Sequence, residues 1–403
     1  MNPAGSRPAS RATLFALALG HGCADTCSGA LLALLPFLVV ERHYSYAAAG
    51  VFALTASVAS AIFQPLVGAH GDRGEAHWLL PTGLLVTGLG IGAVGFATSY
   101  PLTLLAVALC SAGVASYHPE GARWARHASS SRVTADMSIF SVGGTVGYAV
   151  GPLVVAAVLA PLGLHGTAVI AIIPFAAAIV VAIALRRFRR LPVEEHRGER
   201  LTRALASEWR PFVILLALFC LASGVATGLL TYLPLFLVQA RGSSPAASNV
   251  MTSVLLAAGA AGTLLGGIAA VRFGRRLVLV VPQLVLVPAI ALLPSLSYAG
   301  MIPVVIVIGL AMNANVGIAL VLAQEYLPAH MGLATGLTIG LCGGLGGLIV
   351  AGLGLLGDAA GPSSVLYVIA VLPLAVTALA LRLPQPAAAP PGTLWARRVE
   401  AGR

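Results

Sequence analysis

The stretch HGCADTCSGALLALLPFLVV, residues 21–40, decides the fold class, because it is apolar over the length of a lipid bilayer. A hydrocarbon core of about 30 Å needs about 20 apolar helical residues. His21 and Asp25 nevertheless stand near the start of this stretch. Side chains of these types are costly inside a membrane unless they face water or a partner. The stretch therefore predicts a transmembrane helix that contains a functional site.

The rest of the chain has the same character, with 58% hydrophobic and only 9% charged residues among 403. A chain of this composition does not form an ordinary soluble surface. Apolar stretches of spanning length recur at residues 12–40, 46–69, 78–98, 102–124, 135–160, 166–186, 211–238, 248–271, 277–295, 300–324, 331–356 and 363–382. We therefore predict an all-α membrane protein with twelve transmembrane helices.

The two halves of the chain resemble each other. LLPFLVV at 34–40 lies 198 residues before YLPLFLV at 232–238, and a charged loop separates six spans from six. The predicted units are an N-terminal six-helix bundle (1–186), a cytoplasmic linker (187–210), a C-terminal six-helix bundle (211–383) and a disordered, proline-rich cytoplasmic tail (384–403). Duplicated bundles are expected where two halves rock about a site at the membrane midplane.

Glycines repeat between the halves as well. The fifth and eleventh spans carry matching glycines at an offset of 200, namely Gly143, Gly144, Gly147, Gly343, Gly344 and Gly347. Close packing of membrane helices is the simpler explanation for such residues. The alternative, which would suit transport, is that these glycines let the helices bend where the two halves meet.

The arginines predict the orientation, since cytoplasmic loops retain an excess of positive charge. All 23 basic residues are arginines, and with cytoplasmic termini all but Arg42 and Arg241 lie on the cytoplasmic side. The net charge of +10 is thus explained by this bias, together with attraction to anionic lipids. A nucleic-acid partner is not expected.

The cysteines predict no chemistry. Each lies inside a predicted span, where cysteine commonly acts as a small packing residue. Cys23 and Cys27 are one helical turn apart, but no further ligands at metal-site spacing accompany them. We expect no catalytic residues, no metal ligands and no cofactor.

A specific resemblance begins in the loops that follow the second and eighth spans. GAHGDRGEAHW at 68–78 resembles the glycine and Asp-Arg signature of the major facilitator superfamily, and GGIAAVRFGRR at 266–276 is its counterpart without the aspartate. The resemblance implies gating roles for Asp72, Arg73, Arg272, Arg275 and Glu325. Simple solvation of Asp72 in the loop is the alternative. Glu325 precedes Tyr326-Leu327-Pro328 at a cytoplasmic helix end, which favours a structural cap or latch.

Four further stretches resemble the fosmidomycin resistance protein family of drug exporters, over nearly all of residues 12–382. They are GHGCADTCSGALLALLPFL, SYHPEGARWAR, SVGGTVGYAVGPL and QEYLPAHMGLATGLTIGLCGGLGGL, in the first, fourth, fifth and tenth to eleventh spans. The family implies a monomeric exporter in the bacterial inner membrane, driven by proton entry.

Asp25 lies near the midplane, because it is about 21 Å along the first helix from Arg11. His21 is four residues earlier on the same helical face. The superfamily resemblance implies that the first and fourth spans line the cavity, so His21, Asp25, His118 and Glu120 would converge as proton-coupling groups. The open alternatives are a core hydrogen bond for His21, a helix end at His118 before Pro119, and pairing of Glu120 with Arg123 or Arg126.

Substrate contacts are expected from polar side chains within the spans. The candidates are Gln64, Tyr232, Asn313, Asn315 and Arg123. Each of the uncharged ones has an alternative role as an interhelical hydrogen-bonding group. An anionic phosphonate, such as the drug for which the family is named, would need an arginine partner, and Arg123 or Arg126 is nearest.

These observations predict a small-molecule:proton antiporter that works by alternating access, with a proton-coupled uptake symporter as the alternative. An intramembrane enzyme is disfavoured. HPEGARWARH at 118–127 is not the His-Glu-x-x-His motif of zinc proteases, and the sequence shows no nucleotide-binding loop.

Overall fold

The structure is a computed structural model that describes residues 10–71, 76–129, 133–188, 208–327, 334 and 337–384. The described part is helical and contains no strand. In its N-terminal half the helices are α1 (Arg11–Ala33), α2 (Leu35–Arg42), α3 (Tyr46–Gly71), α4 (Leu79–Phe96), α5 (Tyr100–Ala128), α6 (Val133–Leu162), η1 (Gly163–Gly166), α7 (Thr167–Ile170) and α8 (Ile172–Phe188).

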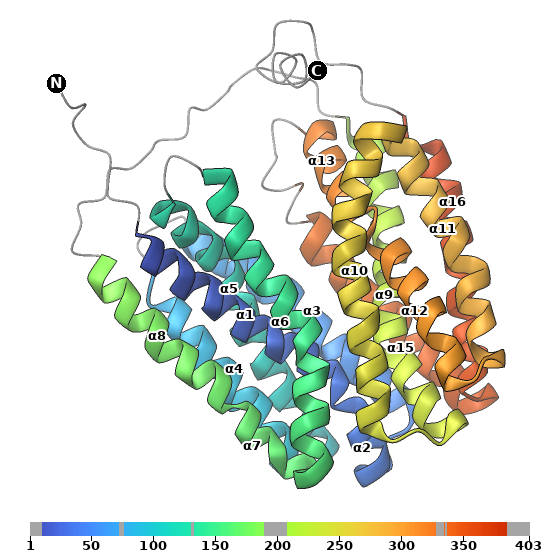
Figure 1. Cartoon of the computed structure of the whole chain (residues 1–403), viewed down its shortest axis with the longest axis horizontal. Coiled ribbons are helices and arrows are strands. Elements are labelled where there is room, and N and C mark those ends of the chain that lie inside the picture. The colour runs from blue at the N-terminus through green and yellow to red at the C-terminus, as the bar shows by residue number, and fades with distance from the viewer. Residues whose placement is uncertain are drawn as a thin grey trace, which may run out of the picture.

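The C-terminal half follows a similar plan. Its helices are α9 (Trp209–Arg241), α10 (Pro245–Phe273), α11 (Arg275–Leu292), η2 (Leu293–Ser295), α12 (Tyr298–Asn313), α13 (Val316–Tyr326), the π-helical turn η4 (Leu337–Leu341), α15 (Cys342–Ala360) and α16 (Pro362–Arg382). Figure 1 shows the two sets as two bundles, with α1 beginning and α16 ending at the upper end.

The predicted twelve spans agree with these helices. Among the described residues, eleven helical stretches are long and apolar enough to cross a membrane. One of them, Asp136–Arg187, is 52 residues long, more than twice the length that one crossing needs. The chain turns within it at η1, where Gly163 has a φ of 59°, so α6 and α8 are separate crossings. Twelve crossings in two six-helix bundles result.

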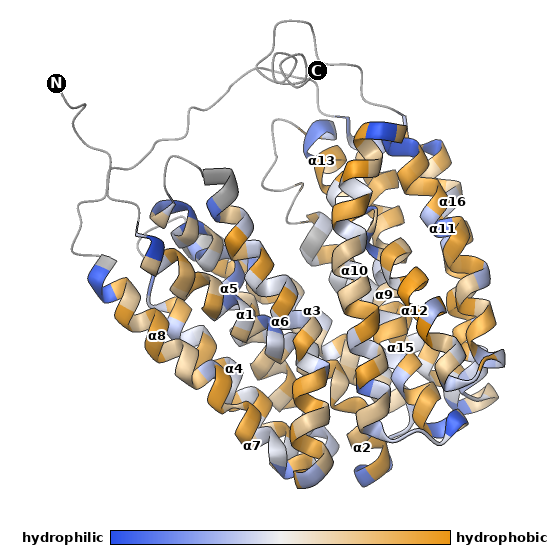
Figure 2. Cartoon of the chain, in the orientation of Figure 1, coloured by the Kyte–Doolittle hydropathy of each residue, from blue (hydrophilic) through white to orange (hydrophobic). Residues whose placement is uncertain are grey.

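Hydrophobic residues make up most of the helices of both bundles, as the colouring of Figure 2 shows. Val271, Leu264 and Ile268 on α10 are 91%, 72% and 66% exposed, which suits contact with lipid tails. The protein is therefore a multi-pass membrane protein, whose polar side chains must find partners or water inside the bundles.

Close helix packing in the N-terminal bundle depends on small residues of α1 and α6. A side chain at Gly147 would collide with the carbonyl oxygen of Gly22, and one at Gly143 would collide with that of Ala18. Absence of side chains lets the two backbones approach, as in other membrane helix pairs. This approach brings α6 against the face of α1 that carries His21 and Asp25.

The bundles meet through α3 with α15 and through α6 with α10. Gly347 lies against Leu54 and Ser57, while Gly354 and Gly357 lie against Tyr46, the first residue of α3. These contacts involve the first half of α3, at the lower end of Figure 1, and the bundles diverge toward the upper end.

Candidate functional site

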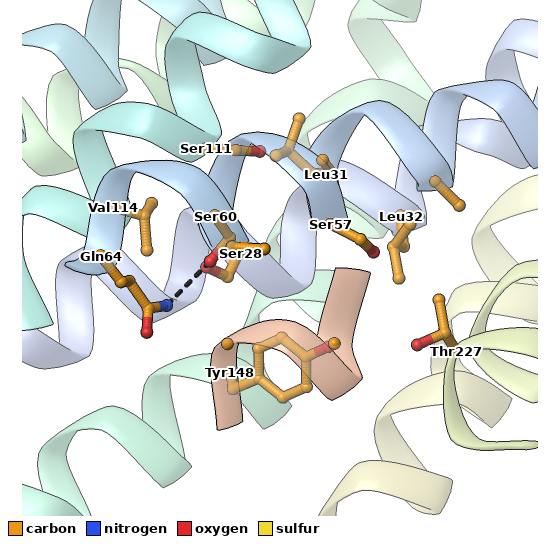
Figure 3. A pocket seen from close by; sticks show the side chains of 15 residues that line it. Ser28, Leu31, Leu32, Ser57, Ser60, Gln64, Ser111, Val114, Tyr148 and Thr227 are labelled. Carbon is orange, nitrogen blue, oxygen red and sulfur yellow. Dashed lines mark hydrogen bonds between the residues drawn. The ribbon is translucent and has the colours of Figure 1, made fainter. Parts of the chain in front are cut away.

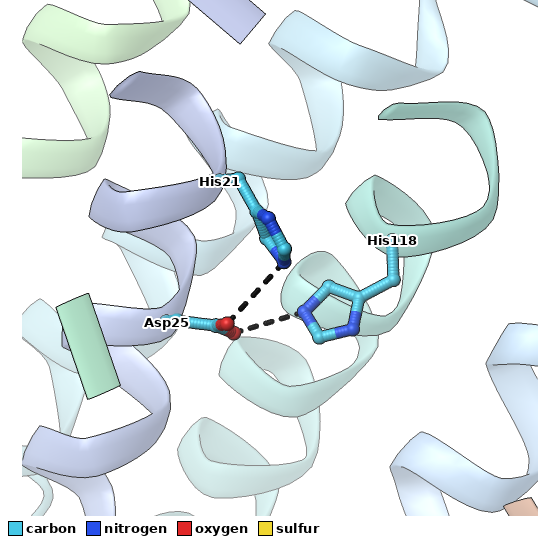
Figure 4. A group of neighbouring side chains, drawn as sticks. All are labelled: His21, Asp25 and His118. Atoms are coloured by element: carbon cyan, nitrogen blue, oxygen red, sulfur yellow. Dashed lines mark hydrogen bonds and ion pairs between the residues drawn. The ribbon is translucent and has the colours of Figure 1, made fainter. Parts of the chain in front are cut away.

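Three titratable side chains from two helices form a cluster inside the N-terminal bundle (Figure 4). His21 Nε2 lies 3.3 Å from Asp25 Oδ2, and His118 Nε2 lies 2.9 Å from Asp25 Oδ1. The side chains of His21 and Asp25 are 13% and 14% exposed, and that of His118 is 33% exposed. The structure thus brings together three of the four residues that were predicted to handle protons.

The backbone of α6 determines which nitrogen of His21 carries a proton. His21 Nδ1 lies 2.9 Å from the carbonyl oxygen of Phe140, which only accepts hydrogen bonds. Nδ1 must therefore donate, and neutral His21 has a bare lone pair on Nε2. The ring of Phe140 also stacks on that of His21, with centroids 4.2 Å apart.

The remaining contacts of the cluster require one additional proton. His118 Nε2–H donates to one carboxylate oxygen of Asp25, but His21 Nε2 and Asp25 Oδ2 are both acceptors in the deprotonated cluster. Two facing acceptors at 3.3 Å repel unless a proton lies between them. One proton, held by either His21 or Asp25, relieves this repulsion.

Gly144 provides the space for this arrangement. A Cβ at Gly144 would lie 2.6 Å from both Asp25 Oδ2 and His21 Nε2. Any side chain there must displace the imidazole or the carboxylate. Gly144 was predicted as a hinge or packing residue, and in the structure it packs directly on the cluster.

Two pockets lie between the bundles, and one of them is lined by His21 and Asp25 of the cluster. The first, here called the His21 pocket, has a volume of about 520 Å³. Its lining combines residues of both bundles: His21, Asp25, Ser141, Thr145, Tyr148, Ala226, Thr227, Leu230, Leu256, Gly259, Ala260, Thr263, Met312 and Asn313. The cluster therefore lies on the wall of a cavity to which α1, α6, α9, α10 and α12 contribute.

The second pocket, here called the Gln64 pocket, has a volume of about 220 Å³ and is rich in serine (Figure 3). Ser28, Ser57, Ser60 and Ser111 line it, and Gln64 donates to Ser60 over 2.8 Å. Tyr148 and Thr227 line both pockets, so the two are neighbouring parts of one central cavity.

The charge of this cavity is unusual for a site that would bind an anion. Of the described residues, those lining either pocket include no arginine, and the sequence contains no lysine. Asp25 is the only carboxylate among them, and hydroxyl groups supply most of the remaining polarity. Asp25, together with its partner His21, is thus the one titratable acid–base pair in this otherwise uncharged lining.

Donor atoms of His21, Asp25 and His118 all lie within 4.8 Å of one another, a spacing that suits a shared cation of any kind. No metal ligands were predicted from the sequence, because the spacing of these residues along the chain matches no metal motif. The 2.9 Å contact between His118 and Asp25 has the length of a hydrogen bond.

Glu120 and Arg123 lie apart from the cluster. Glu120 is buried, 2% exposed, and accepts hydrogen bonds from Arg123 at 3.4 Å and from Trp124 Nε1 at 3.2 Å. The geometry thus matches the pairing alternative for Glu120. Arg123 does not line either pocket among the described residues, because this pairing holds it beside its own helix.

The candidates for substrate contact separate into two groups. Gln64 and Asn313 line the two pockets. Tyr232 lies elsewhere: it is fully buried, and its hydroxyl donates to the Val350 carbonyl over 2.6 Å. Asn315 is buried between α12 and α13. Helix packing in the C-terminal bundle thus removes both from the cavity wall.

The predicted gating residues are only partly described. Asp72 and Arg73 lie outside the described residues. Arg275 at the start of α11 forms an ion pair with Glu325 near the end of α13, with 2.5 Å between Nη1 and Oε2. The guanidinium of Arg272 lies over the ring of Phe273, 5.5 Å from its centroid. Arg275 and Glu325 therefore tie two helices of the same bundle.

The matched glycines occupy different surroundings. Gly143, Gly144 and Gly147 contact α1 within the N-terminal bundle. Gly344 and Gly347 instead contact Ala61, Leu54 and Ser57 of α3, across the bundle interface, and Gly343 borders the Gln64 pocket. Only the second set thus lies where the halves meet.

Two polar contacts between the bundles were missed by sequence reasoning. The Asp358 carboxylate accepts from the backbone N–H groups of Tyr46 (2.7 Å) and Ala47 (3.0 Å), so it caps α3 from the other bundle. Asn249 Nδ2 donates to the Ala33 carbonyl over 2.9 Å. Asp358 is the only acidic residue between Glu325 and Glu400, and this isolation in an apolar region was the available signal.

Comparison with known proteins agrees with this architecture. The family model of the Major Facilitator Superfamily matches residues 17–351. The chain is 33% identical over 373 residues to the fosmidomycin resistance protein of Escherichia coli (strain K12), with 90% of each chain covered. It is 29% identical over 368 residues to the uncharacterized MFS-type transporter YfnC of Bacillus subtilis (strain 168), also with 90% of each covered.

Solved structures show the same fold. A bacterial homologue of the human lysosomal transporter Spinster, in an inward-facing and occupied conformation, aligns with a TM-score of 0.77 at 18% identity, covering 94% of this chain and 97% of that one. The nucleoside transporter NupG aligns with a TM-score of 0.69 at 17% identity, covering 92% and 99%. With twelve crossings in two bundles and a cavity between them, this chain belongs to the major facilitator superfamily of membrane transporters.

Proposed function

We propose that this transporter is a small-molecule:proton antiporter that exports its substrate across the bacterial inner membrane by alternating access. The observation that carries the proposal is the position of the His21–Asp25–His118 cluster on the wall of the cavity between the bundles. A proton-sharing group inside a membrane protein is a functional site by default. Here it contacts the space that a substrate would occupy.

The cluster supports coupling because it has two alternative states. With one additional proton all of its contacts are satisfied, and without it His21 Nε2 and Asp25 Oδ2 are left as facing acceptors. Substrate that enters the cavity alters the balance between these states, and protonation alters the affinity for substrate by the same factor. This reciprocity is what a secondary transporter needs.

Alternating access would open and close the ends of the cavity in turn. At the lower end in Figure 1, Asp358 caps α3 across the interface and Tyr46 stacks on Tyr232, so this end is closed. We assign the upper end to the cytoplasm, since the arginine bias places both termini there. Arg275, Arg272 and Glu325 lie on that side. Asp72 and Arg73, outside the described residues, keep their proposed role as latch residues from the sequence alone.

Helices of a single chain enclose the cavity, so we propose a monomer. The relative from Escherichia coli is named for resistance to the drug fosmidomycin, which supports export rather than uptake. An uptake symporter would use the same cluster, with substrate and proton favouring one another. The sign of this coupling separates the two functions.

The test is proton flux in liposomes that contain the purified full-length protein, with an imposed pH gradient and a panel of drugs that includes fosmidomycin. We expect an active compound to drive proton movement in the opposite direction, and Asp25→Asn to abolish it while substrate binding is retained. Proton flux that is unchanged in Asp25→Asn would exclude this cluster as the coupling site.

Two controls make the result specific. His165→Gln removes an exposed histidine of η1, away from the cavity, and should leave the flux at the wild-type level. Repeating the assay with a chelator distinguishes a proton site from a metal-dependent one, because chelation should not change the flux. Movement of proton and substrate in the same direction would replace antiport by symport.

A further inference from the structure

The charges around the cluster indicate the chemical class of the substrate. Besides His21 and His118, the titratable groups around Asp25 are Tyr148 of α6, Cys23 and Cys27 of α1, and Tyr117 of α5, whose ring centroid lies 6.4 Å from that of His21. None of these provides a fixed positive charge. Of the other helices packed on α1, α4 carries no charged residue, and α8 carries only Arg186 and Arg187 at its last turn. On α5, Arg123 pairs with Glu120, and Arg126 is exposed in the last turn.

The opposite wall of the cavity is uncharged. From α9, α10 and α12 the polar side chains that line the His21 pocket are those of Thr227, Thr263 and Asn313. Among the described lining residues, an anionic substrate would therefore meet no arginine, one carboxylate, and the imidazole of His21. Burial of an unpaired anion in such surroundings is strongly unfavourable.

The position between His21 Nε2 and Asp25 Oδ2 is complementary to a donor. Both atoms are acceptors when the cluster lacks its additional proton, because the Phe140 carbonyl holds the proton of His21 on Nδ1. Both residues line the His21 pocket. A group with several N–H donors and a positive charge, such as an ammonium, can take the place of the proton and satisfy both atoms.

We infer that the substrates are hydroxyl-bearing or otherwise polar primary amines, whose ammonium group binds His21 Nε2 and Asp25 Oδ2 in place of the shared proton. The inference rests on the proposed function, since it names the substrate class of that same site. The hydroxyl groups of Ser141, Thr145 and Thr227 would contact the polar remainder of the molecule. An aromatic drug would find only Tyr148 as an aromatic partner among the lining residues.

Replacement of a proton by an ammonium makes the two cations competitors. When the amine binds, the proton leaves the cluster for water on the same side of the membrane, and when a proton returns from the other side, the amine leaves. The same number of positive charges occupies the site in both states. Competition of this kind produces antiport, whereas an anion would favour the protonated cluster and produce symport.

The experiment uses three matched probes, which are 1-amino-1-deoxysorbitol, sorbitol and fosmidomycin, with a series of primary alkylamines beside the first. Binding to the full-length protein in detergent is measured by calorimetry at several pH values, and proton release is measured in weakly buffered solution. We expect the amines to bind with release of about one proton, and their affinity to rise up to about tenfold per pH unit while the cluster is protonated.

Two variants accompany the wild type. Asp25→Asn should lose the pH dependence and at least about tenfold of the amine affinity, because an amide carries no charge. His165→Gln should behave as the wild type.

Equal binding of sorbitol and the amine, no binding of any amine, or binding of fosmidomycin with proton uptake would each overturn the assignment. The last result, with fosmidomycin-driven flux lost in Asp25→Asn, would reject the amine while retaining the proton site. If the proposed function itself is wrong, the outcome differs: substrate-driven proton flux would then be retained in Asp25→Asn.

Discussion

The two bundles share a scaffold but not a chemistry. Pro36 corresponds to Pro234 in the repeat, and Tyr100 corresponds to Tyr298. Each of these tyrosines donates to a backbone carbonyl of a neighbouring helix, Tyr100 to Ala48 and Tyr298 to Ala247, both over 2.7 Å. The same offset of 198 therefore aligns α1 with α9, and α5 with α12 and α13.

At that offset the cluster has no counterpart. The positions of His21, Asp25 and His118 correspond to Phe219, Ser223 and Val316 in the C-terminal bundle. The glycines differ in the same way, since those of α6 accommodate the cluster and those of α15 form the contact with α3. Among the described residues, the N-terminal bundle thus provides the titratable groups of the cavity, and the C-terminal bundle provides an uncharged wall and the Asp358 cap on α3.

Of the changes that test this difference between the bundles, removal of the Asp25 carboxylate should have the largest effect on coupled proton flux. Asp25→Asn eliminates the charge that the two histidines share, and we expect coupled flux to fall by about 100-fold or more, the scale on which positioned proton-transfer groups act. Ser223→Ala, at the corresponding position, should transport at nearly the wild-type rate. Equal losses in both variants would show that the halves contribute equally to coupling.

A methyl group at Gly144 should disturb the cluster without removing it. The new Cβ of Gly144→Ala would lie 2.6 Å from Asp25 Oδ2, so the carboxylate must move, and we expect about a tenfold loss of flux, equivalent to about 1.4 kcal/mol. Gly352→Ala on α15 adds its methyl group to open space and serves as the control. Normal flux in Gly144→Ala would mean that the cluster tolerates displacement.

Loss of the cap from Asp358 should loosen the closed end of the cavity. A helix cap contributes about 0.5–2 kcal/mol, so Asp358→Ala should shift the equilibrium between closed and open forms by roughly 2- to 30-fold. Pulsed EPR distances between spin labels at Ser45 and Ala360 would measure the shift. Asp358→Asn retains an acceptor oxygen and should open less. Identical distances in wild type and Asp358→Ala would rule out this contact as a latch.

The smallest effect is expected where the halves are alike. Tyr100→Phe and Tyr298→Phe each remove one hydrogen bond to a carbonyl, at a cost of about 1 kcal/mol in the free energy of unfolding. Because the two bonds are equivalent, the two losses should agree within about 0.5 kcal/mol. Thermal unfolding in detergent measures both, and a clear difference would limit the structural equivalence of the repeats.

The sequence by itself determined the twelve crossings and the repeat, and it singled out Asp25 as a candidate for the site. These properties are local, since helix rise and hydropathy can be read along a single stretch, and an acid at mid-membrane depth needs a partner wherever it occurs. His21 could be placed on the same face of α1 for the same reason. Gln64 and Asn313, which were expected to contact substrate, line the two pockets, and the contact with substrate stays a prediction.

Tertiary structure decided which residues meet. The Phe140 carbonyl that fixes the protonation of His21 is 119 residues distant, and Asp358 reaches α3 across 312 residues. Tyr232 and Glu120 have side chains suited to a site, but neighbouring helices bury the first and Trp124 and Arg123 bind the second. Such contacts depend on how helices pack, and a side chain's type along the sequence does not specify the partner that packing brings to it.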